Sequence, residues 1–230
     1  MIPGKIDSKI NNTYHYIISI EEIKKVCKKY KVTITEYLTA IYIYAIYLEL
    51  YDKKSKKEIV ITIPINLRKY YNVDTLKNFF VCTDIYVSKN IYTFDEILKE
   101  VYNEFKEKIT KEKIKEYLAR DVRIGTNKFI KVIPLFFKSL FMKKIFPLFY
   151  KPSTSTVSNV GIIEIDNNFK KYIDNIFVLV MPNITQKIKC TISSFGNKLN
   201  LIINSNIDSL NFISTLTILL KKDIANIKLQ

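Results

Sequence analysis

Two polar stretches hold the side chains best suited to hydrogen-bond a ligand, and each lies beside a run of β-branched residues. The first is Val60–Phe80, VITIPINLRKYYNVDTLKNFF, with polar groups at Asn66, Arg68 and Asn78. A strand that ends in Pro-Ile-Asn-Leu-Arg delivers an amide and a guanidinium to one point at the rim of a sheet. The second is Ser153–Ile163, STSTVSNVGII, whose hydroxyl and amide groups belong to Ser155, Thr156, Ser158 and Asn159.

The second stretch has two interpretations that the sequence leaves even. Strand alternation separates Thr156 and Ser158 from Ser155 and Asn159, so only one pair can face a ligand. The other interpretation is that these hydroxyls pair with neighbouring backbone in an edge strand.

The only histidine is His15, in the segment Asn11–Ile18. Apolar and polar positions alternate there with a period of two, which predicts a strand with His15 on the same face as Thr13 and Ile17. Histidine is the commonest general base near neutral pH. A partly exposed strand histidine is nevertheless the favoured interpretation over a catalytic one.

The remaining segments predict an α/β architecture with a mixed β-sheet and flanking helices in a single domain, 1–230. Ile59–Ile63 is β-branched and predicts a buried strand whose ladder pairing ends at Pro64, because proline has no N–H to donate. Further strands are expected at Phe79–Val87, Ser153–Ile165, Asn175–Pro182, Ile188–Phe195 and Leu199–Asn204, with a hairpin turn at Gly196-Asn197.

Capping boxes mark the starts of three predicted helices, at Ser19 with Glu22, Thr33 with Glu36, and Thr93 with Glu96. These helices are expected to end near Tyr30, Leu50 and Ile109. Further helices are expected at Lys111–Arg123, Asn127–Phe149 and Ile207–Leu220. In the first of these, Ile114, Leu118 and Val122 are expected to point inward and Gly125 to be the C-cap. The second is rich in Phe.

Composition excludes several classes of protein. The 230 residues are 48% hydrophobic, which excludes a disordered chain. The net charge of +15 is spread along the chain without a stacking or base-reading motif, so a solvated basic surface is expected rather than a nucleic-acid partner. Three widely separated cysteines favour a reducing, cytoplasmic location with neither disulfides nor a metal site. Neither a secretory signal nor a membrane span is predicted, and attachment to a membrane surface is not favoured.

Several motifs together resemble a known family. PINLR followed by TLKNFF is similar to the P-V-N-L-R … T-L-x-N-F-F signature of alcohol acetyltransferases, within the chloramphenicol acetyltransferase-like and condensation-domain superfamily. STSTVSNVGII resembles the family's T-x-S-N-L-G strand, Ser19–Leu48 its pair of helices, and Ile188–Leu220 its closing hairpin and helix. The resemblance covers nearly the whole chain, but only one lobe of the two-lobed family fold.

The resemblance implies transfer of an acyl group from a CoA or carrier thioester, used as co-substrate with no bound cofactor, to a small hydroxyl or amine acceptor. The family's base lies in an N-terminal H-x-x-x-D motif, whereas residue 19, four after His15, is serine. That lobe is therefore expected to be absent and to be supplied by a partner, unless the chain self-associates, is truncated or is a remnant.

The same resemblance assigns roles to the polar residues. Ser155, Thr156, Ser158 and Asn159 would line the channel, and a hydroxyl from this region would help to stabilise the oxyanion. Asn66, Arg68 and Asn78 would lie at the lobe interface, with Arg68 paired to the aspartate of the missing motif. The rival hypothesis is a non-catalytic module that binds a membrane or protein partner through its basic surface and Phe-rich helix.

Overall fold

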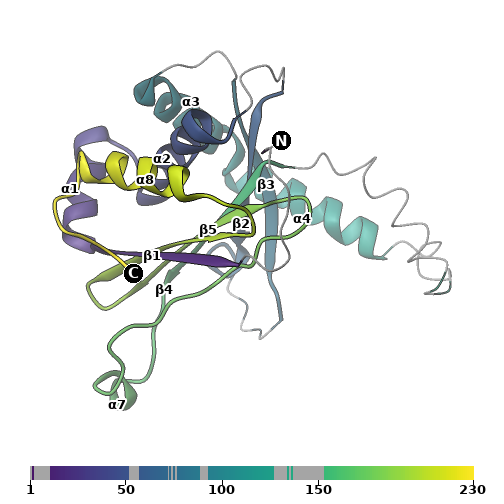
Figure 1. The fold of residues 1–230 in the computed structure, drawn as a ribbon. Helices are drawn as coiled ribbons and strands as arrows, with labels where there is room; N and C mark the ends of the chain where they lie inside the picture. The colour runs from purple at the N-terminus through teal and green to yellow at the C-terminus, as the bar shows by residue number, and fades with distance from the viewer. Residues whose placement is uncertain are drawn as a thin grey trace.

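The computed structural model describes residue 2 and residues 11–51, 57–71, 73, 75, 77–88, 93–126, 134, 136 and 153–230. These residues form an α/β fold with a mixed sheet, which confirms the predicted class (Figure 1). The strands are β1 Asn12–Ser19, β2 Ile59–Asn66, β3 Phe80–Val87, β4 Ser155–Ile162, β5 Ile188–Phe195, β6 Lys198–Ser205 and β7 Ile227–Leu229. The helices are α1 Ile20–Tyr30, α2 Ile34–Glu49, α3 Phe94–Lys108, α4 Lys111–Thr126, α7 Asn167–Lys170 and α8 Leu210–Lys221, with a 3₁₀ turn at Leu67–Lys69.

The seven strands follow the order β3-β2-β4-β5-β6-β1-β7. β4 runs parallel to both β2 and β5, and the other neighbours are antiparallel. β5 and β6 form the predicted hairpin, in which Gly196 adopts φ +58°, a left-handed conformation that glycine adopts without steric cost.

The main core lies between the sheet and the helices α1, α2, α3 and α8. Figure 1 shows these helices on one side of the sheet, and we call the face they cover the helical face. Tyr16 and Ile18 of β1 and Ile61 of β2 contribute buried side chains to it. A second, smaller cluster of Ile65, Leu67, Val81 and Ile114 packs α4 near the end of β2.

Two of the three predicted capping boxes are formed, at Thr33 with Glu36 and at Thr93 with Glu96. The prediction for Ser19 was wrong, because its side chain makes no capping hydrogen bond although it occupies the N-cap position. Glu22 instead accepts hydrogen bonds from the backbone N–H and side-chain amide of Asn226, near the far end of the chain. A tertiary partner has thus replaced the local one.

β2 continues through Pro64 to Asn66, so the expected end of pairing at Pro64 was wrong. Both backbone polar groups of Val60 face β4, since Thr154 N–H donates to its carbonyl and Thr154 Oγ1 accepts from its N–H. By strand alternation the nitrogen of Pro64 faces the same side, where pairing with β4 ends at Thr62. The absence of an N–H on Pro64 therefore costs no hydrogen bond between strands.

The outer edge of β3 is covered by side chains from α3. Glu104 accepts a hydrogen bond from Tyr86 N at 2.7 Å, and Glu100 accepts one from Ser88 N at 2.8 Å. Lys108 Nζ donates to Asp84 O at 2.9 Å. Backbone groups that an edge strand would leave open are thereby paired.

Other differences lie at the ends of elements. α4 continues through Gly125 to Thr126, and Val122 is 52% exposed rather than inward. The strand expected at Asn175–Pro182 was wrong, because this segment pairs with no described strand, whereas β7 was not predicted. The Phe-rich segment falls almost entirely outside the described residues. Among the described helices, none is long and apolar enough to cross a bilayer.

Candidate functional site

The carboxyl ends of the parallel strands β2, β4 and β5 meet at one edge of the sheet, the position where open α/β sheets commonly bind ligands. The two polar stretches converge there. Lys69 Nζ lies 3.7 Å from the position that a Cβ on Gly161 would occupy. Gly161 has φ +85° within an irregularity between β4 and β5, a conformation that favours glycine.

Asn159 joins a third element to this edge. Its Oδ1 accepts a hydrogen bond from Gly161 N at 2.9 Å, and its Nδ2 donates to Thr35 Oγ1 at 2.7 Å in the first turn of α2. The Asn159 amide thus links the irregular backbone at the end of β4 to the start of α2.

The register separates the four candidate polar residues as strand alternation requires. Ser155 lies on the helical face and is fully buried. Its hydroxyl donates to Ile188 O at 2.7 Å and lies 2.8 Å from the Tyr42 hydroxyl. Because the single Ser155 proton goes to a carbonyl, Tyr42 must donate to Ser155. Burial raises the pKa of Tyr42 well above its ordinary value, so its proton is retained.

Thr156 and Ser158 lie on the opposite face of the sheet. Thr156 Oγ1 donates to Gln186 Oε1 at 2.9 Å. Ser158 is half-buried, and its hydroxyl makes no hydrogen bond to another described residue. Of the three hydroxyls among the four candidates, Ser158 is the one that remains available at this edge.

A network of buried polar side chains on the face of the sheet opposite the helices was not predicted from the sequence. Gln186 Nε2 donates to Ser153 Oγ at 2.5 Å, and Thr62 Oγ1 lies 2.7 Å from both Ser153 Oγ and Asp84 Oδ1. The signal available in the sequence was Thr62, the one polar residue within Ile59–Ile63. This network links Thr156 to β2 and β3 and fixes the register of the strands beneath the candidate site.

The buried hydroxyls of Thr191 and Ser193 on β5 were also missed. Neither has a hydrogen-bond partner among the described residues. Thr191 is the cross-strand neighbour of Ser158, and Ser193 is that of Gly161. Hydroxyl groups therefore continue from β4 onto β5 on the face opposite the helices.

Arg68 makes its hydrogen bonds within its own loop. Nε and Nη2 donate to Thr75 O at 3.2 and 2.7 Å, and Nη2 also donates to Lys77 O at 2.6 Å. Asn66 Oδ1 accepts from Arg68 N at 3.0 Å, which sets the 3₁₀ turn after β2. Arg68 and Asn78 are exposed, and Arg68 Nη1 makes no hydrogen bond to another described residue.

His15 lies away from this edge and is 7% exposed, so the expected partial exposure was wrong. Its Nε2 is 2.8 Å from Asn200 Oδ1, and its ring centroid is 4.6 Å from that of Phe177. Asn200 Nδ2 donates to Ile176 O, which directs Oδ1 to His15 and requires a proton on His15 Nε2. Because His15 Nε2 donates its proton to Asn200, this nitrogen is not available to accept a proton from a substrate.

The cysteine thiols are protonated at neutral pH. Burial raises the pKa of Cys27 to about 11, assisted by the Glu36 carboxylate, and burial also raises the pKa values of Cys82 and Cys190. Within the described parts of the chain, no three His, Cys, Asp or Glu side chains are grouped so that they could hold a metal ion.

No protein-family model matches the sequence, and no curated protein is significantly similar to it in sequence. Solved structures do share the fold. The wax ester synthase/diacylglycerol acyltransferase from Marinobacter aquaeolei VT8 aligns with 96% of this chain over 52% of its own length. The TM-score is 0.55 and the sequence identity is 11%. The epimerization domain from the third module of tyrocidine synthetase B aligns with 97% of this chain over 50% of its own length. The TM-score is 0.60 and the sequence identity is 12%.

The trichothecene 15-O-acetyltransferase from Fusarium sporotrichioides matches 94% of the chain over 47% of its own length, with a TM-score of 0.60 and 10% identity. The chain therefore spans about half the length of these structures. It has the fold of one half of chloramphenicol acetyltransferase-like acyltransferases and condensation domains.

Proposed function

We propose that this chain is one lobe of an acyltransferase that moves an acyl group from a CoA or carrier thioester to a hydroxyl or amine. The observation that carries the proposal is the convergence of Lys69 and Gly161, from two separate motifs, at the carboxyl edge of a sheet with this fold. The general base would come from a second lobe carrying H-x-x-x-D.

Within this lobe, Ser158 is proposed as the donor to the oxyanion of the tetrahedral intermediate. The step needs a polar hydrogen aimed at the developing charge. Support comes from the hydrogen bonds of the other hydroxyls, because Ser155 donates to Ile188 O and Thr156 to Gln186. Asn159 is proposed as a positioning residue, since its amide joins the irregular backbone at Gly161 to α2.

Arg68 is proposed to face the second lobe. Its Nε and Nη2 anchor the loop at Thr75 and Lys77, so the guanidinium is fixed in orientation. Nη1 of this exposed side chain then remains to donate a charge-assisted hydrogen bond to a carboxylate of the other lobe.

Binding of a thioether analogue of acetyl-CoA, which cannot transfer its acyl group, tests the proposal. We expect amide hydrogen exchange to slow at residues 66–69 and 158–162, with adenosine as the control that leaves this edge unchanged. Protection elsewhere, or none, would contradict the thioester site and favour the non-catalytic binding module.

Release of free thiol from acetyl-CoA tests the need for a second lobe. The chain alone should release none above buffer, because His15 Nε2 is engaged by Asn200 and lies away from the proposed edge. Turnover that disappears in the His15→Ala variant would show that His15 is the base and that no second lobe is needed.

A further inference from the structure

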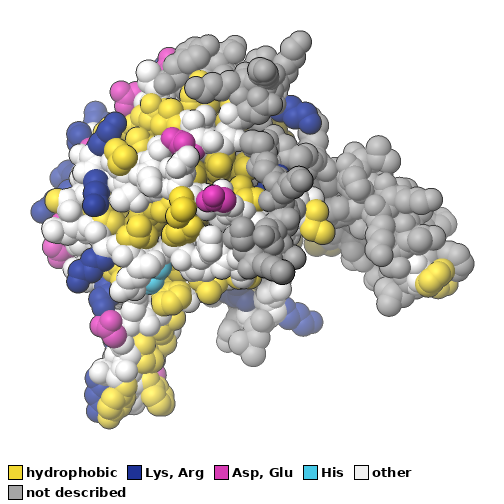
Figure 2. All heavy atoms as spheres, viewed as in Figure 1, with side chains coloured by type: hydrophobic (Ala, Val, Ile, Leu, Met, Phe, Trp, Pro, Cys, Tyr) yellow, Lys and Arg dark blue, Asp and Glu magenta, His cyan; other side chains and the backbone are white. Residues whose placement is uncertain are grey.

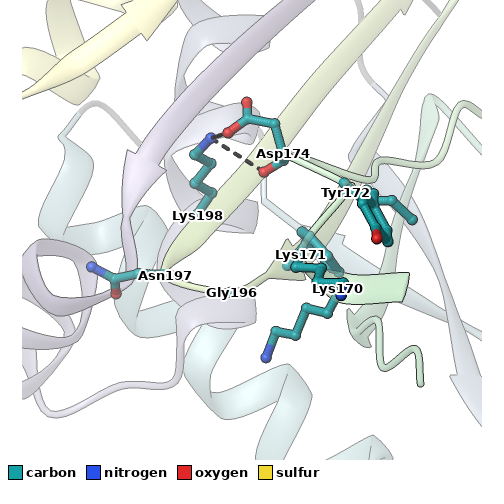
Figure 3. A pocket seen from close by; sticks show the side chains of 9 residues that line it. Lys170, Lys171, Tyr172, Asp174, Gly196, Asn197 and Lys198 are labelled. Atoms are coloured by element: carbon teal, nitrogen blue, oxygen red, sulfur yellow. Dashed lines mark hydrogen bonds and ion pairs between the residues drawn. The ribbon is translucent and has the colours of Figure 1, made fainter. Parts of the chain in front are cut away.

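Between β4 and β5 the chain leaves the body as a projection that we call the arm, residues 163–187. Figure 1 shows α7 at its tip, below the carboxyl end of β4. At its base, Lys198 Nζ forms an ion pair with Asp174 Oδ1 at 2.7 Å. Figure 3 shows this pair together with Lys170, Lys171 and the Gly196 turn. These residues line an open hollow of about 490 Å³.

The returning half of the arm, Asn175–Pro182, is fastened to the sheet along one edge. Asn200 Nδ2 donates to Ile176 O at 3.1 Å, and Asn204 Nδ2 donates to Val180 O at 3.3 Å. Both asparagines are on β6, four residues apart, so this part of the arm runs along β6 in an extended conformation, over the face of the sheet opposite the helices. The polar backbone groups of Ile176 and Val180 therefore point towards the sheet.

The opposite edge of the same segment is open. In an extended chain, successive residues direct their N–H and C=O groups to alternate sides, so those of Phe177, Leu179 and Met181 point away from the sheet. None of these groups makes a hydrogen bond to another residue that the structure describes. This part of the arm is thus an extended segment whose outer edge is unpaired among the described residues.

Large apolar side chains accompany this open edge. Phe177 and Leu179 are each 45% exposed and Met181 is 46% exposed. Figure 2 shows hydrophobic side chains gathered along the projection at the lower left. Four further large apolar residues between β4 and β5 are exposed as well, namely Phe169, Tyr172, Ile173 and Ile184, and so are two residues in the last part of β4, Val160 and Ile162.

We propose that the arm is a self-association surface, on which Asn175–Pro182 pairs antiparallel with the same residues of a second copy of this chain. A two-fold axis through Leu179 places Leu179 opposite itself and Phe177 opposite Met181. Both pairs are then hydrogen-bonded pairs of the ladder, because their open backbone groups face each other. The register also brings an aromatic ring opposite a thioether, a favourable contact.

The charge distribution favours a second copy as the occupant. The chain carries +15, so two copies repel, yet residues 175–186 contain no charged side chain. The uncharged, apolar and self-complementary segment is where like chains can meet with least repulsion. This inference is independent of the proposed catalytic role, which concerns the sheet edge.

The test is the oligomeric state of the full chain, measured by light scattering during size-exclusion chromatography over a range of concentrations. We expect a dimer for the native sequence. Leu179→Lys places two like charges directly opposite each other and should weaken dimerisation at least about tenfold, equivalent to 1.4 kcal/mol. Ile218→Lys, a matched change at an exposed α8 residue, should leave the dimer intact.

Complementation makes the two-fold register falsifiable. Leu179→Asp chains should also be monomeric alone, and an equal mixture with Leu179→Lys chains should restore a dimer, because opposite charges then face each other. A native chain that stays monomeric, or a dimer that Leu179→Lys leaves unchanged, would overturn the proposal and assign the open edge to another partner such as a second lobe.

Discussion

At the scale of single residues, burial and hydrogen bonding decide which polar groups remain free for chemistry. The three hydroxyls of the candidate strand have similar chemistry in the sequence. Tertiary contacts distinguish them, because Ser155 is enclosed with Tyr42, Thr156 contacts Gln186, and Ser158 has no partner among the described residues. A polar residue in a strand is therefore interpretable only once its cross-strand neighbours are known.

Ser155→Ala should lower the free energy of unfolding by about 1–3 kcal/mol, because it leaves the buried Tyr42 hydroxyl without its acceptor. Adding Tyr42→Phe should recover part of the loss, since both partners are then removed. The matched variant Ser158→Ala should stay within about 0.5 kcal/mol. Urea denaturation measures all three, and equal effects at positions 155 and 158 would contradict this assignment.

At the scale of secondary-structure elements, local signals succeeded where no tertiary partner competed. Thr33 and Ser19 begin adjacent helices with the same motif, yet only Thr33 forms the box, because Glu22 binds Asn226. Similarly, Pro64 is tolerated because the pairing of β2 with β4 ends at Thr62, before it reaches the proline. Neither outcome could be predicted from a window of neighbouring residues.

Thr33→Ala should destabilise the fold by about 1 kcal/mol through loss of the N-cap. Ser19→Ala should cost less than about 0.5 kcal/mol, because the Ser19 hydroxyl caps nothing. Thermal and urea denaturation compare the two variants. A larger loss for Ser19→Ala would show that the capping assignment is reversed.

Asp223 joins three helices and should make stability sensitive to acid. Burial alone would raise the pKa of its carboxyl, but hydrogen bonds from Lys29, Tyr37 and Tyr30 outweigh burial and lower the pKa below its ordinary 3.8. A lowered pKa stabilises the fold fully above pH 3.8, and this contribution is lost as pH falls through the lower, folded value.

Asp223→Asn should therefore reduce stability at neutral pH and flatten its decline below pH 3.8. The comparison is the free energy of unfolding at a series of pH values for both chains. Parallel curves would mean that Asp223 does not contribute to the acid dependence.

At the scale of the whole molecule, the sequence predicted the class of fold because helix and strand periods were clear and the motifs fell in family order. It predicted β5 over the residues observed, Ile188–Phe195, and the Gly196 turn. It could not predict that Asn175–Pro182 would pair with no described strand, because alternation specifies a strand without specifying its neighbour. The convergence of Lys69 on Gly161 depends on sheet order, which no local pattern reveals.

Net charge gives a prediction at this scale. Two copies of a chain with +15 repel each other, so added salt should strengthen dimerisation by screening that repulsion. Sedimentation at increasing sodium chloride concentration measures the dissociation constant. A dimer that weakens with salt would show that opposite charges, rather than the uncharged arm, hold the copies together.

The covering of β3 by α3 has a consequence for how far assembly can proceed. Sheets with a free border on each side can add copies without limit and grow into fibres. Here one border is occupied by Glu100, Glu104 and Lys108, and the other ends in the short strand β7. Because one border is covered and the other offers only a three-residue strand, the main sheet is a poor template for further growth, and the proposed pairing through the arm should stop at two chains.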